Sequence, residues 1–311
     1  GRRHEDVVVL KKQKDDMTLE KAEAGGWPLT PNATLYVEGD LQRPNGVPLP
    51  VGITYAPLMN QEGSLVGIIA TVRDITRFRE ADELKTTFIS VISHELKTPV
   101  ALIKGYVSTL RREDAQWDPS IVQDSLEVIE EEADRLTELI ENLLDATRLQ
   151  AGVLSINLAD VALTPLIERI VAKFRTQTTQ HEFIIDLPPN LPVIMADENR
   201  ISQLISNLLS NAIKYSPEGG KIRISGQERS EQIVICVSDE GCGISPEDIP
   251  HIFDRFYRSD AAKRTTKGAG LGLYLARAVV EAHGGHIWVD PKTEKGTRIC
   301  FSLPKDAKRL K

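Results

Sequence analysis

The sequence predicts a multidomain chain in which an antiparallel β segment precedes a long α-helical hairpin and a C-terminal α/β domain. Three observations support this prediction. Short β-prone runs alternate with turn signals over residues 31–76, two helical patterns of about 33 residues flank a break at 114–119, and strands alternate with helices from residue 153 onward. A chain of 311 residues is also long enough for two or three hydrophobic cores.

The β segment is expected to be an antiparallel meander. One turn signal at 44–46 separates two of its runs, and another at 60–63 separates Val51–Met59 from Leu65–Val72. Residues 1–30 are charged and end in a Gly-Gly-Trp-Pro breaker, so their pattern predicts no structure.

The two helical patterns each carry one apolar face. The first has the seam of a paired helix, formed by Ala81, Leu84, Phe88 and Val91. Asp118 and Pro119 are a typical N-cap and first residue for the second helix, which we expect to end at Gly152. Helices of this length, roughly 50 Å, leave a broad apolar face uncovered in a single hairpin. A homodimer that forms a four-helix bundle would cover these faces.

The alternating pattern after residue 153 has the size of one α/β domain. The expected strands are Ser155–Leu158, Glu182–Leu187, Val193–Ala196, Lys221–Gln227, Gln232–Asp239, His286–Asp290 and Thr297–Leu303. The expected helices are 164–179, 198–213 and 270–283.

Composition narrows the class of protein. Apolar residues make up 41% of the chain and charged residues 27%, as in ordinary globular proteins. A net charge of −7 argues against a nucleic-acid partner, because nucleic-acid binding depends on clustered Lys and Arg. Apolar runs stay well short of the ~18 residues that span a bilayer, and a signal-peptide pattern is absent. We therefore expect a cytoplasmic chain, with a membrane anchor only if one lies upstream of Gly1.

The three cysteines, Cys236, Cys242 and Cys300, are odd in number and lack CxxC spacing. This fits a reducing compartment and offers no zinc site. We expect them to be buried or half-buried packing residues.

The first motif with chemical potential lies on the first helix. His94 is mostly the free base at neutral pH and can act as a nucleophile, and Glu95 beside it can take a ring proton. Thr98 lies one helical turn further on the same surface, and Pro99 removes a helix hydrogen bond there. A metalloprotease HExxH site is excluded because position 98 is threonine. Alone, this pattern most often indicates a plain surface histidine.

A polar stripe is expected on the helix at 198–213. Asn207 and Asn211 are four residues apart and Lys214 follows three residues later, so all three share one face. Amide oxygens and a lysine can hold Mg²⁺ and a triphosphate. The alternative is a solvated polar face.

Two glycine segments could surround a nucleotide. Asp239 follows an apolar strand and could accept the amine of adenine, while Gly241 and Gly243 would let the backbone approach a flat ring; a tight turn is the alternative. Gly268, Gly270 and Gly272 open a helix and expose backbone amides that could bind an anion. Their spacing matches neither GxGxxG nor GxxxxGK[ST]. The pair Gly296-Thr297 is too short to interpret alone.

The polar run at 259–267 lies between these segments. It contains Lys263, Arg264 and Lys267 without an apolar anchor, so it is either a lid that phosphates order or a solvated loop.

The segment Phe253-Asp254-Arg255-Phe256-Tyr257-Arg258 also lies between the two glycine segments. In this order, the segments resemble the H, N, G1, F and G2 boxes of sensor histidine kinases over about 77–305. The resemblance implies a dimerisation and histidine-phosphotransfer hairpin at 77–152, a Bergerat-type (GHKL) ATP-binding α/β two-layer sandwich at 153–306, and a tail at 307–311. Residues 31–76 resemble the C-terminal strands of a PAS domain. The front of a PAS domain has no counterpart in 1–30, so a half sensor with an exposed core face is expected.

The resemblance also implies roles for individual residues. His94 would be the phosphoacceptor, Glu95 its acid/base partner, and Thr98 a residue for dephosphorylating the response regulator. The residues implied to bind ATP are Asn207, Asn211, Lys214, Tyr215, Asp239, Gly241, Gly243, Arg258, Gly268, Gly270, Leu271, Gly272 and Thr297. Asn211 would also hold Mg²⁺.

The implied activity is ATP-dependent autophosphorylation of His94, followed by phosphotransfer to an aspartate of a response regulator. Two alternatives stay open. One is a GHKL ATPase of the gyrase or chaperone type that does not phosphorylate itself. The other is a dimeric PAS-linked scaffold that binds nucleotide only as a structural ligand.

Overall fold

The structure is a computed structural model of the chain. It describes residue 4 and residues 8–11, 18–28, 30, 32–43, 46–112, 114, 116–150, 156–260, 268–291, 293 and 295–306. The chain divides into two compact units, Gly1–Ser90 and Val91–Lys311, and each unit is described by itself.

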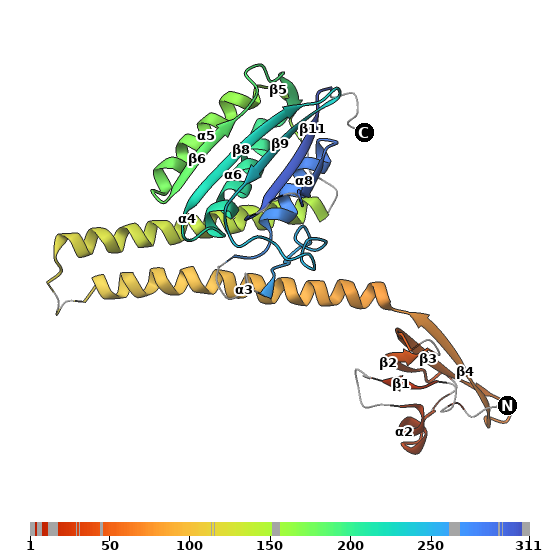
Figure 1. The fold of residues 1–311 in the computed structure, drawn as a ribbon. Coiled ribbons are helices and arrows are strands. Elements are labelled where there is room, and N and C mark those ends of the chain that lie inside the picture. The colour runs from red at the N-terminus through yellow and green to blue at the C-terminus, as the bar shows by residue number, and fades with distance from the viewer. Residues whose placement is uncertain are drawn as a thin grey trace. The chain divides into compact units, whose positions relative to one another are not determined.

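The N-terminal unit is built around a four-stranded antiparallel sheet in the order β1-β2-β3-β4 (Figure 1). Its elements are β1 (Leu10–Lys11), α2 (Leu19–Ala24), β2 (Leu35–Gln42), β3 (Pro48–Met59) and β4 (Leu65–Asp74). The backbone of Asn60 closes the predicted turn by donating to Ser64 O at 2.9 Å. The predicted meander is therefore confirmed.

The prediction of a bare β segment with an exposed core face is wrong. β1 pairs with β2, and α2 places Leu19 in a buried cluster with Val51, Ile53 and Tyr55. A two-residue strand and a six-residue helix are too short to show a hydrophobic period, so the pattern of 1–30 did not predict them. The predicted turn residues 44 and 45 lie outside the described residues.

The helical hairpin consists of α3 (Thr76–Leu110) and α4 (Pro119–Gln150). α3 continues through Pro99, and Asp118 caps α4 by accepting a bond from Ser120 N at 2.9 Å. The predicted end at Gly152 lies outside the described residues. Large apolar side chains stay exposed on the hairpin at Val100, Val107, Ile121, Leu126, Ile140 and Leu144. Among the described residues, the helices lack an apolar stretch of the length and hydropathy that would cross a membrane.

The C-terminal domain is a two-layer α/β sandwich (Figure 1). Its strands are β5 (Ala159–Val161), β6 (His181–Asp186), β7 (Ile194–Ala196), β8 (Gly220–Glu228), β9 (Gln232–Ser238), β10 (His286–Val289) and β11 (Arg298–Pro304). Its helices include α5 (Leu163–Gln177), α6 (Glu198–Lys214) and α8 (Gly272–Ala282). The main sheet has the order β10-β11-β9-β8-β6, with only β6 and β8 parallel, and β5 pairs with β7.

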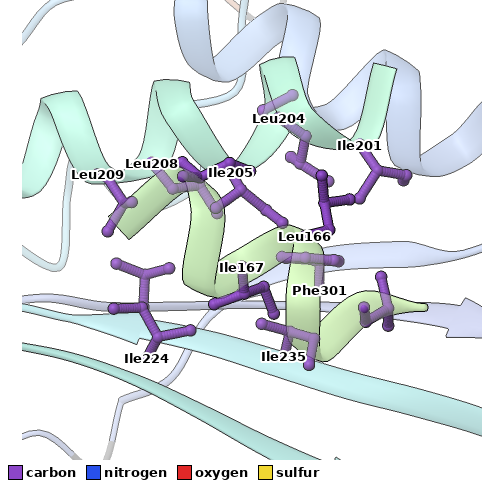
Figure 2. Packing of buried hydrophobic residues seen from close by; sticks show 14 of the residues in the cluster. Leu166, Ile167, Ile201, Leu204, Ile205, Leu208, Leu209, Ile224, Ile235 and Phe301 are labelled. Atoms are coloured by element: carbon purple, nitrogen blue, oxygen red, sulfur yellow. The ribbon is translucent and has the colours of Figure 1, made fainter. Parts of the chain in front are cut away.

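The core of this domain lies between the helices and one face of the sheet. Alternate residues of β9 point into it, so Ile235 is fully buried against Phe301 and Ile224 of neighbouring strands (Figure 2). From the helical layer, Ile167 of α5 and Leu204 of α6 complete the packing. Because α6 buries its apolar face here, its opposite, polar face is left to form a site.

The strand predicted at Ser155–Leu158 is wrong over residues 156–158, and Ser155 lies outside the described residues; β5 begins at Ala159 instead. The backbone N–H of Asn157 donates to Asp197 Oδ2 at 2.9 Å rather than to a strand. Asp197 is also the N-cap of α6, accepting from Asn199 N and Arg200 N at 3.1 Å each. This segment therefore supports the start of α6.

The cysteine prediction needs correction. Cys236 and Cys300 are buried as expected, but they are direct register partners on β9 and β11 and form a disulfide. Cys242 is a free, exposed cysteine rather than a packing residue. Cysteine spacing along the chain did not predict this pairing because the pairing depends on strand register.

Candidate functional site

The polar face of α6 forms the wall of a cavity of about 530 Å³ between the hairpin and the α/β domain. The predicted site residues that line it are Glu95, Asn207, Asn211, Lys214, Tyr215, Arg258, Gly268, Gly270, Leu271 and Gly272. Hairpin residues close its other side, among them Pro99, Arg135, Glu138 and Asn142. Asn207, Asn211 and Lys214 thus share the wall of one cavity.

A second cavity, of about 360 Å³, lies beside the first within the α/β domain. The predicted site residues that line it are Asn211, Tyr215, Asp239, Gly243, Arg258 and Thr297. Its wall is otherwise largely apolar, with Leu208, Val237 and Ile244. Asn211, Tyr215 and Arg258 line both cavities, so one elongated molecule with a flat apolar end and a charged end would fit along them.

Asp239 is fixed in the wall of this second, apolar cavity. Its Oδ1 accepts bonds from Gly241 N at 2.9 Å and Thr297 N at 3.2 Å. Burial raises the pKa of this carboxyl group, and the two N–H groups act against that rise. A carboxyl held in this way can accept a hydrogen bond from a flat ring with an amine.

Steric crowding explains why two positions around the cavities are glycine. A Cβ on Gly241 would collide with the carbonyl oxygen of Tyr215, so the loop after β9 can approach the end of α6 only with glycine there. Gly270 has a φ of 68°, and a Cβ there would lie 2.8 Å from the carbonyl carbon of Phe256. The N–H of Phe256, which itself has a φ of 64°, donates to Gly270 O at 3.0 Å. This bond holds Phe256 against the glycine loop that contains Gly270.

Lys214 supplies positive charge to the larger cavity. Burial, together with the nearby positive charge of Arg258, lowers the pKa of its ammonium group to about 8, although Glu95 and Glu138 across the cavity oppose the change. Arg135 also disfavours the charged form. An anion in this cavity would stabilise the ammonium form.

His94 lies on the hairpin next to the cavity wall. Its side chain is 81% exposed, and its Nδ1 lies 3.9 Å from Glu95 Oε1. Glu95 and Pro99 line the cavity, whereas His94, Thr98 and Gly241 are the predicted site residues that line neither cavity. The Thr98 hydroxyl donates to His94 O at 3.3 Å, and so fixes the turn that carries the histidine.

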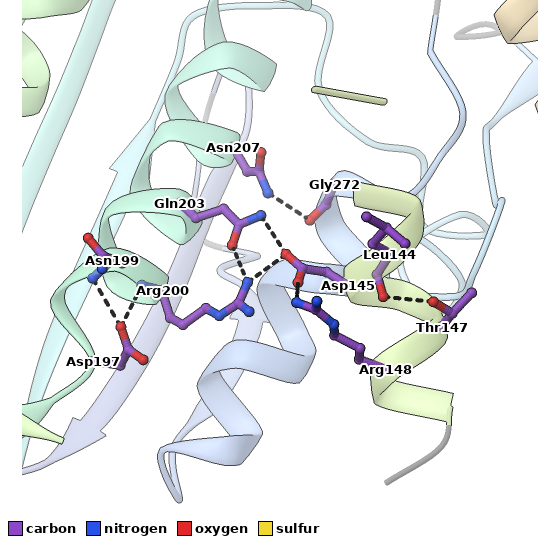
Figure 3. A network of polar contacts seen from close by, with 10 residues as sticks. All are labelled: Leu144, Asp145, Thr147, Arg148, Asp197, Asn199, Arg200, Gln203, Asn207 and Gly272. Atoms are coloured by element: carbon purple, nitrogen blue, oxygen red, sulfur yellow. Dashed lines mark hydrogen bonds and ion pairs between the residues drawn. The ribbon is translucent and has the colours of Figure 1, made fainter. Parts of the chain in front are cut away.

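Sequence reasoning missed a polar network that joins the hairpin to α6 (Figure 3). Asp145 of α4 is buried and accepts bonds from Arg200 Nη1 at 2.5 Å and Gln203 Nε2 at 3.1 Å. Arg148 approaches the same carboxylate at 4.0 Å. Arg200 and Gln203 lie seven and four residues before Asn207 on the same face of α6. That spacing is the sequence signal that could have indicated that they extend the polar face.

The predicted lid at 259–267 falls mainly outside the described residues. Residues 261–267, which contain all three of its basic side chains, are not described. That prediction therefore stays a prediction.

Three family models match the chain. Residues 11–77 match the PAS domain model, and residues 196–307 match the model of the histidine kinase-, DNA gyrase B- and HSP90-like ATPase. Residues 84–152 match the His Kinase A (phospho-acceptor) domain, which separates this chain from the gyrase and chaperone groups. These three domains are those of a sensor histidine kinase.

The chain is also similar in sequence to known sensor histidine kinases. The sensor histidine kinase WalK of Bacillus subtilis is 36% identical over 256 residues, which are 81% of this chain and 42% of WalK. The chain thus spans less than half of this relative.

Solved histidine kinases share the fold. ThkA in complex with the response regulator protein TrrA aligns with a TM-score of 0.54 and 22% identity, over 89% of this chain and 80% of that one. ShkA, solved with AMPPNP, aligns with a TM-score of 0.52 and 25% identity, over 69% of this chain and 45% of that one.

Proposed function

We propose that this chain is an ATP-dependent protein-histidine kinase that phosphorylates its own His94 and passes the phosphoryl group to an aspartate of a response regulator. One observation carries the proposal. A single cavity is walled on one side by Asn211 and Lys214 of the α/β domain, and on the other by Glu95, the neighbour of His94. The family models support both halves of this arrangement.

In the proposed complex the adenine ring occupies the smaller, apolar cavity, where Asp239 accepts its amine. The phosphates extend into the larger cavity toward Lys214, Arg258 and the N-terminus of α8, whose backbone amides favour an anion. AMPPNP in the ShkA structure supports a nucleotide of this class.

Side chains of this protein can perform the proposed phosphoryl transfer. Nδ1 of His94 faces Glu95, which leaves Nε2 to attack the γ-phosphorus. The N–P bond forms as the bond from the γ-phosphorus to the bridging oxygen breaks, and ADP leaves with that electron pair. Glu95 can accept the Nδ1 proton, while Lys214 and Arg258 offset the charge of the phosphates.

Mg²⁺ fits the donors present in the larger cavity. Among the described residues, no group of three or more His, Cys, Asp and Glu side chains could hold a metal ion. An ion there would depend on the amide oxygen of Asn211 and on phosphate oxygens, a shell that suits Mg²⁺. When bound, Mg²⁺ neutralises phosphate charge.

A homodimer and a response regulator are the proposed partners. The exposed apolar residues of α3 and α4 fit the faces of a four-helix bundle. The structure of ThkA with TrrA supports a response regulator as the kind of protein that docks on such a chain. We place this activity in the cytoplasm, where ATP is available.

Nucleotide affinity is expected to depend on pH through Lys214. Its pKa of about 8 means that the ammonium form is lost between pH 7 and pH 9. Nucleotide phosphates favour that form, so binding takes up a proton, and the affinity for AMPPNP should fall by up to roughly 10-fold over this range. Titration calorimetry at both pH values measures the change.

The matched control is Lys214→Arg, because arginine stays charged throughout this range. Its affinity for AMPPNP should vary much less between pH 7 and pH 9. An equal pH dependence in both proteins would rule out Lys214 as the titrating group.

We further propose that the chain removes phosphate from the regulator, with Thr98 on the His94 turn as the contributing residue. Thr98→Ala should leave autophosphorylation within about 2-fold and slow the loss of phosphate from a purified phosphorylated regulator by at least ~10-fold. Thr109→Ala, an exposed threonine on the same helix, is the control. Regulator decay that is unchanged by Thr98→Ala would reject this role.

The kinase proposal itself is tested with γ-labelled ATP. Label retained on the chain supports it. Release of free phosphate without retained label would indicate an ATPase of the gyrase or chaperone type instead.

A further inference from the structure

Arg135 of α4 lies opposite the reactive turn of α3. Glu95 is 15 residues before Leu110, where α3 ends, and Arg135 is 16 residues after Pro119, where α4 begins. Both residues are therefore about the same distance from the turn of the hairpin. Arg135 Nη2 reaches Glu95 Oε2 at 3.7 Å.

The two oxygens of Glu95 have different neighbours. Oε1 lies 3.9 Å from His94 Nδ1, and Oε2 lies 3.7 Å from Arg135. Arg135 therefore does not compete with the histidine for the same oxygen. Consecutive helical residues point about 100° apart, so nothing in the helix itself turns a glutamate toward the residue before it. A cation across the hairpin can select the rotamer that does so.

Arg135 is itself held in place. Its Nη1 lies 3.6 Å from Glu132 Oε2, one helical turn earlier on α4. The side chains of Glu95 and Glu132 are 13% and 15% exposed, so the guanidinium group lies between two largely buried carboxylates. Their charges offset that of Arg135, whereas Lys214 and Arg258 line the same cavity from the other domain and remain the candidates for binding phosphate.

We propose that Arg135 is a positioning residue for phosphoryl transfer: it orients the Glu95 carboxylate so that this group faces Nδ1 of His94. The arrangement of nucleophile, base and a third group that orients the base is a general solution for activating a weak nucleophile. Arg135 touches neither the phosphoryl group nor His94 in this role. The inference rests on the proposed kinase function and adds a residue that the sequence did not single out.

The test is the autophosphorylation rate of the full chain as a function of ATP concentration. Arg135→Ala should lower kcat by roughly 10- to 100-fold and leave KM for ATP within about 2-fold, because misplaced reacting groups slow the chemical step without weakening binding. Arg135→Lys keeps a cation and should recover part of kcat. Glu132→Gln removes the ion pair between Glu132 and Arg135 and leaves Glu95 unchanged, so it should give a smaller loss of kcat.

Arg112→Ala is the matched control, since Arg112 is an exposed arginine of the hairpin that pairs with Asp114. It should behave as the wild-type chain does. Thermal melting and AMPPNP affinity identify a variant that has lost its fold. If Arg135→Ala is unfolded, the kcat values of Arg135→Lys and Glu132→Gln decide the test.

Four results would overturn the inference. Wild-type kcat in Arg135→Ala would show that Glu95 needs no orienting cation. A raised KM with unchanged kcat would show that Arg135 binds nucleotide instead, and a raised kcat would show that it restrains Glu95. A wild-type chain that takes up no label would overturn the proposed function and this inference with it.

Discussion

Replacing Asn211 with alanine is expected to lower autophosphorylation by about 100- to 1,000-fold and to remove the Mg²⁺ dependence of nucleotide binding. Asn211 is one of the residues shared by the two cavities, at the junction between their apolar and charged ends. Its amide oxygen is the protein ligand that we propose for Mg²⁺. Removing it takes away a metal ligand and a phosphate contact together.

The measurement is AMPPNP affinity with and without Mg²⁺, together with the labelling rate. Asn199→Ala is the control, because Asn199 is an exposed asparagine at the opposite end of α6. If Asn211→Ala bound nucleotide with the wild-type Mg²⁺ dependence, our proposal that the phosphates and Mg²⁺ lie beside Asn211 in the larger cavity would be wrong.

Local patterns predicted the site-bearing helix well. The apolar period at 198–213 corresponds to α6 at Glu198–Lys214, and the polar stripe on its other face lines the larger cavity. One face of α6 must pack on the sheet, so the direction of Asn207, Asn211 and Lys214 follows from the sequence alone. The strands next to Asp239 and Thr297, β9 and β11, were also predicted, because their apolar runs are bounded by turn residues.

Contacts between distant segments could not be predicted in this way. Cys236 and Cys300 meet because β9 and β11 pair in one particular register. Asp145 meets Arg200 because α4 packs against the helical layer of the α/β domain, and an acidic residue on an amphipathic helix gives no sign of its partner. Both pairings depend on tertiary packing rather than on local periodicity.

The histidine motif is a further case in which the sequence did not predict a contact between distant segments. The sequence placed Glu95 beside His94, but it did not indicate that Arg135 lies against the other oxygen of that carboxylate. Knowing that contact required the register of the whole hairpin. The role of Thr98 stays a prediction, and the structure adds that its hydroxyl donates to the carbonyl of His94.

Replacing His94 with glutamine is expected to abolish labelling from γ-labelled ATP while leaving AMPPNP affinity within about 2-fold. His94 lines neither cavity, so its loss should not disturb nucleotide binding. The imidazole next to Glu95 is lost with it, and the amide of glutamine is not a nucleophile under these conditions. His251→Gln, an exposed histidine of the α/β domain, is the control and should label normally.

The chemical identity and position of the label decide whether this chain phosphorylates itself on His94. The wild-type chain is incubated with γ-labelled ATP and Mg²⁺, denatured, and divided between acid and base before the bound label is counted and mapped by mass spectrometry. The account predicts a label that acid removes and base preserves, located on His94 and absent from His94→Gln. Equal labelling of His94→Gln, or a label that resists acid, would contradict it.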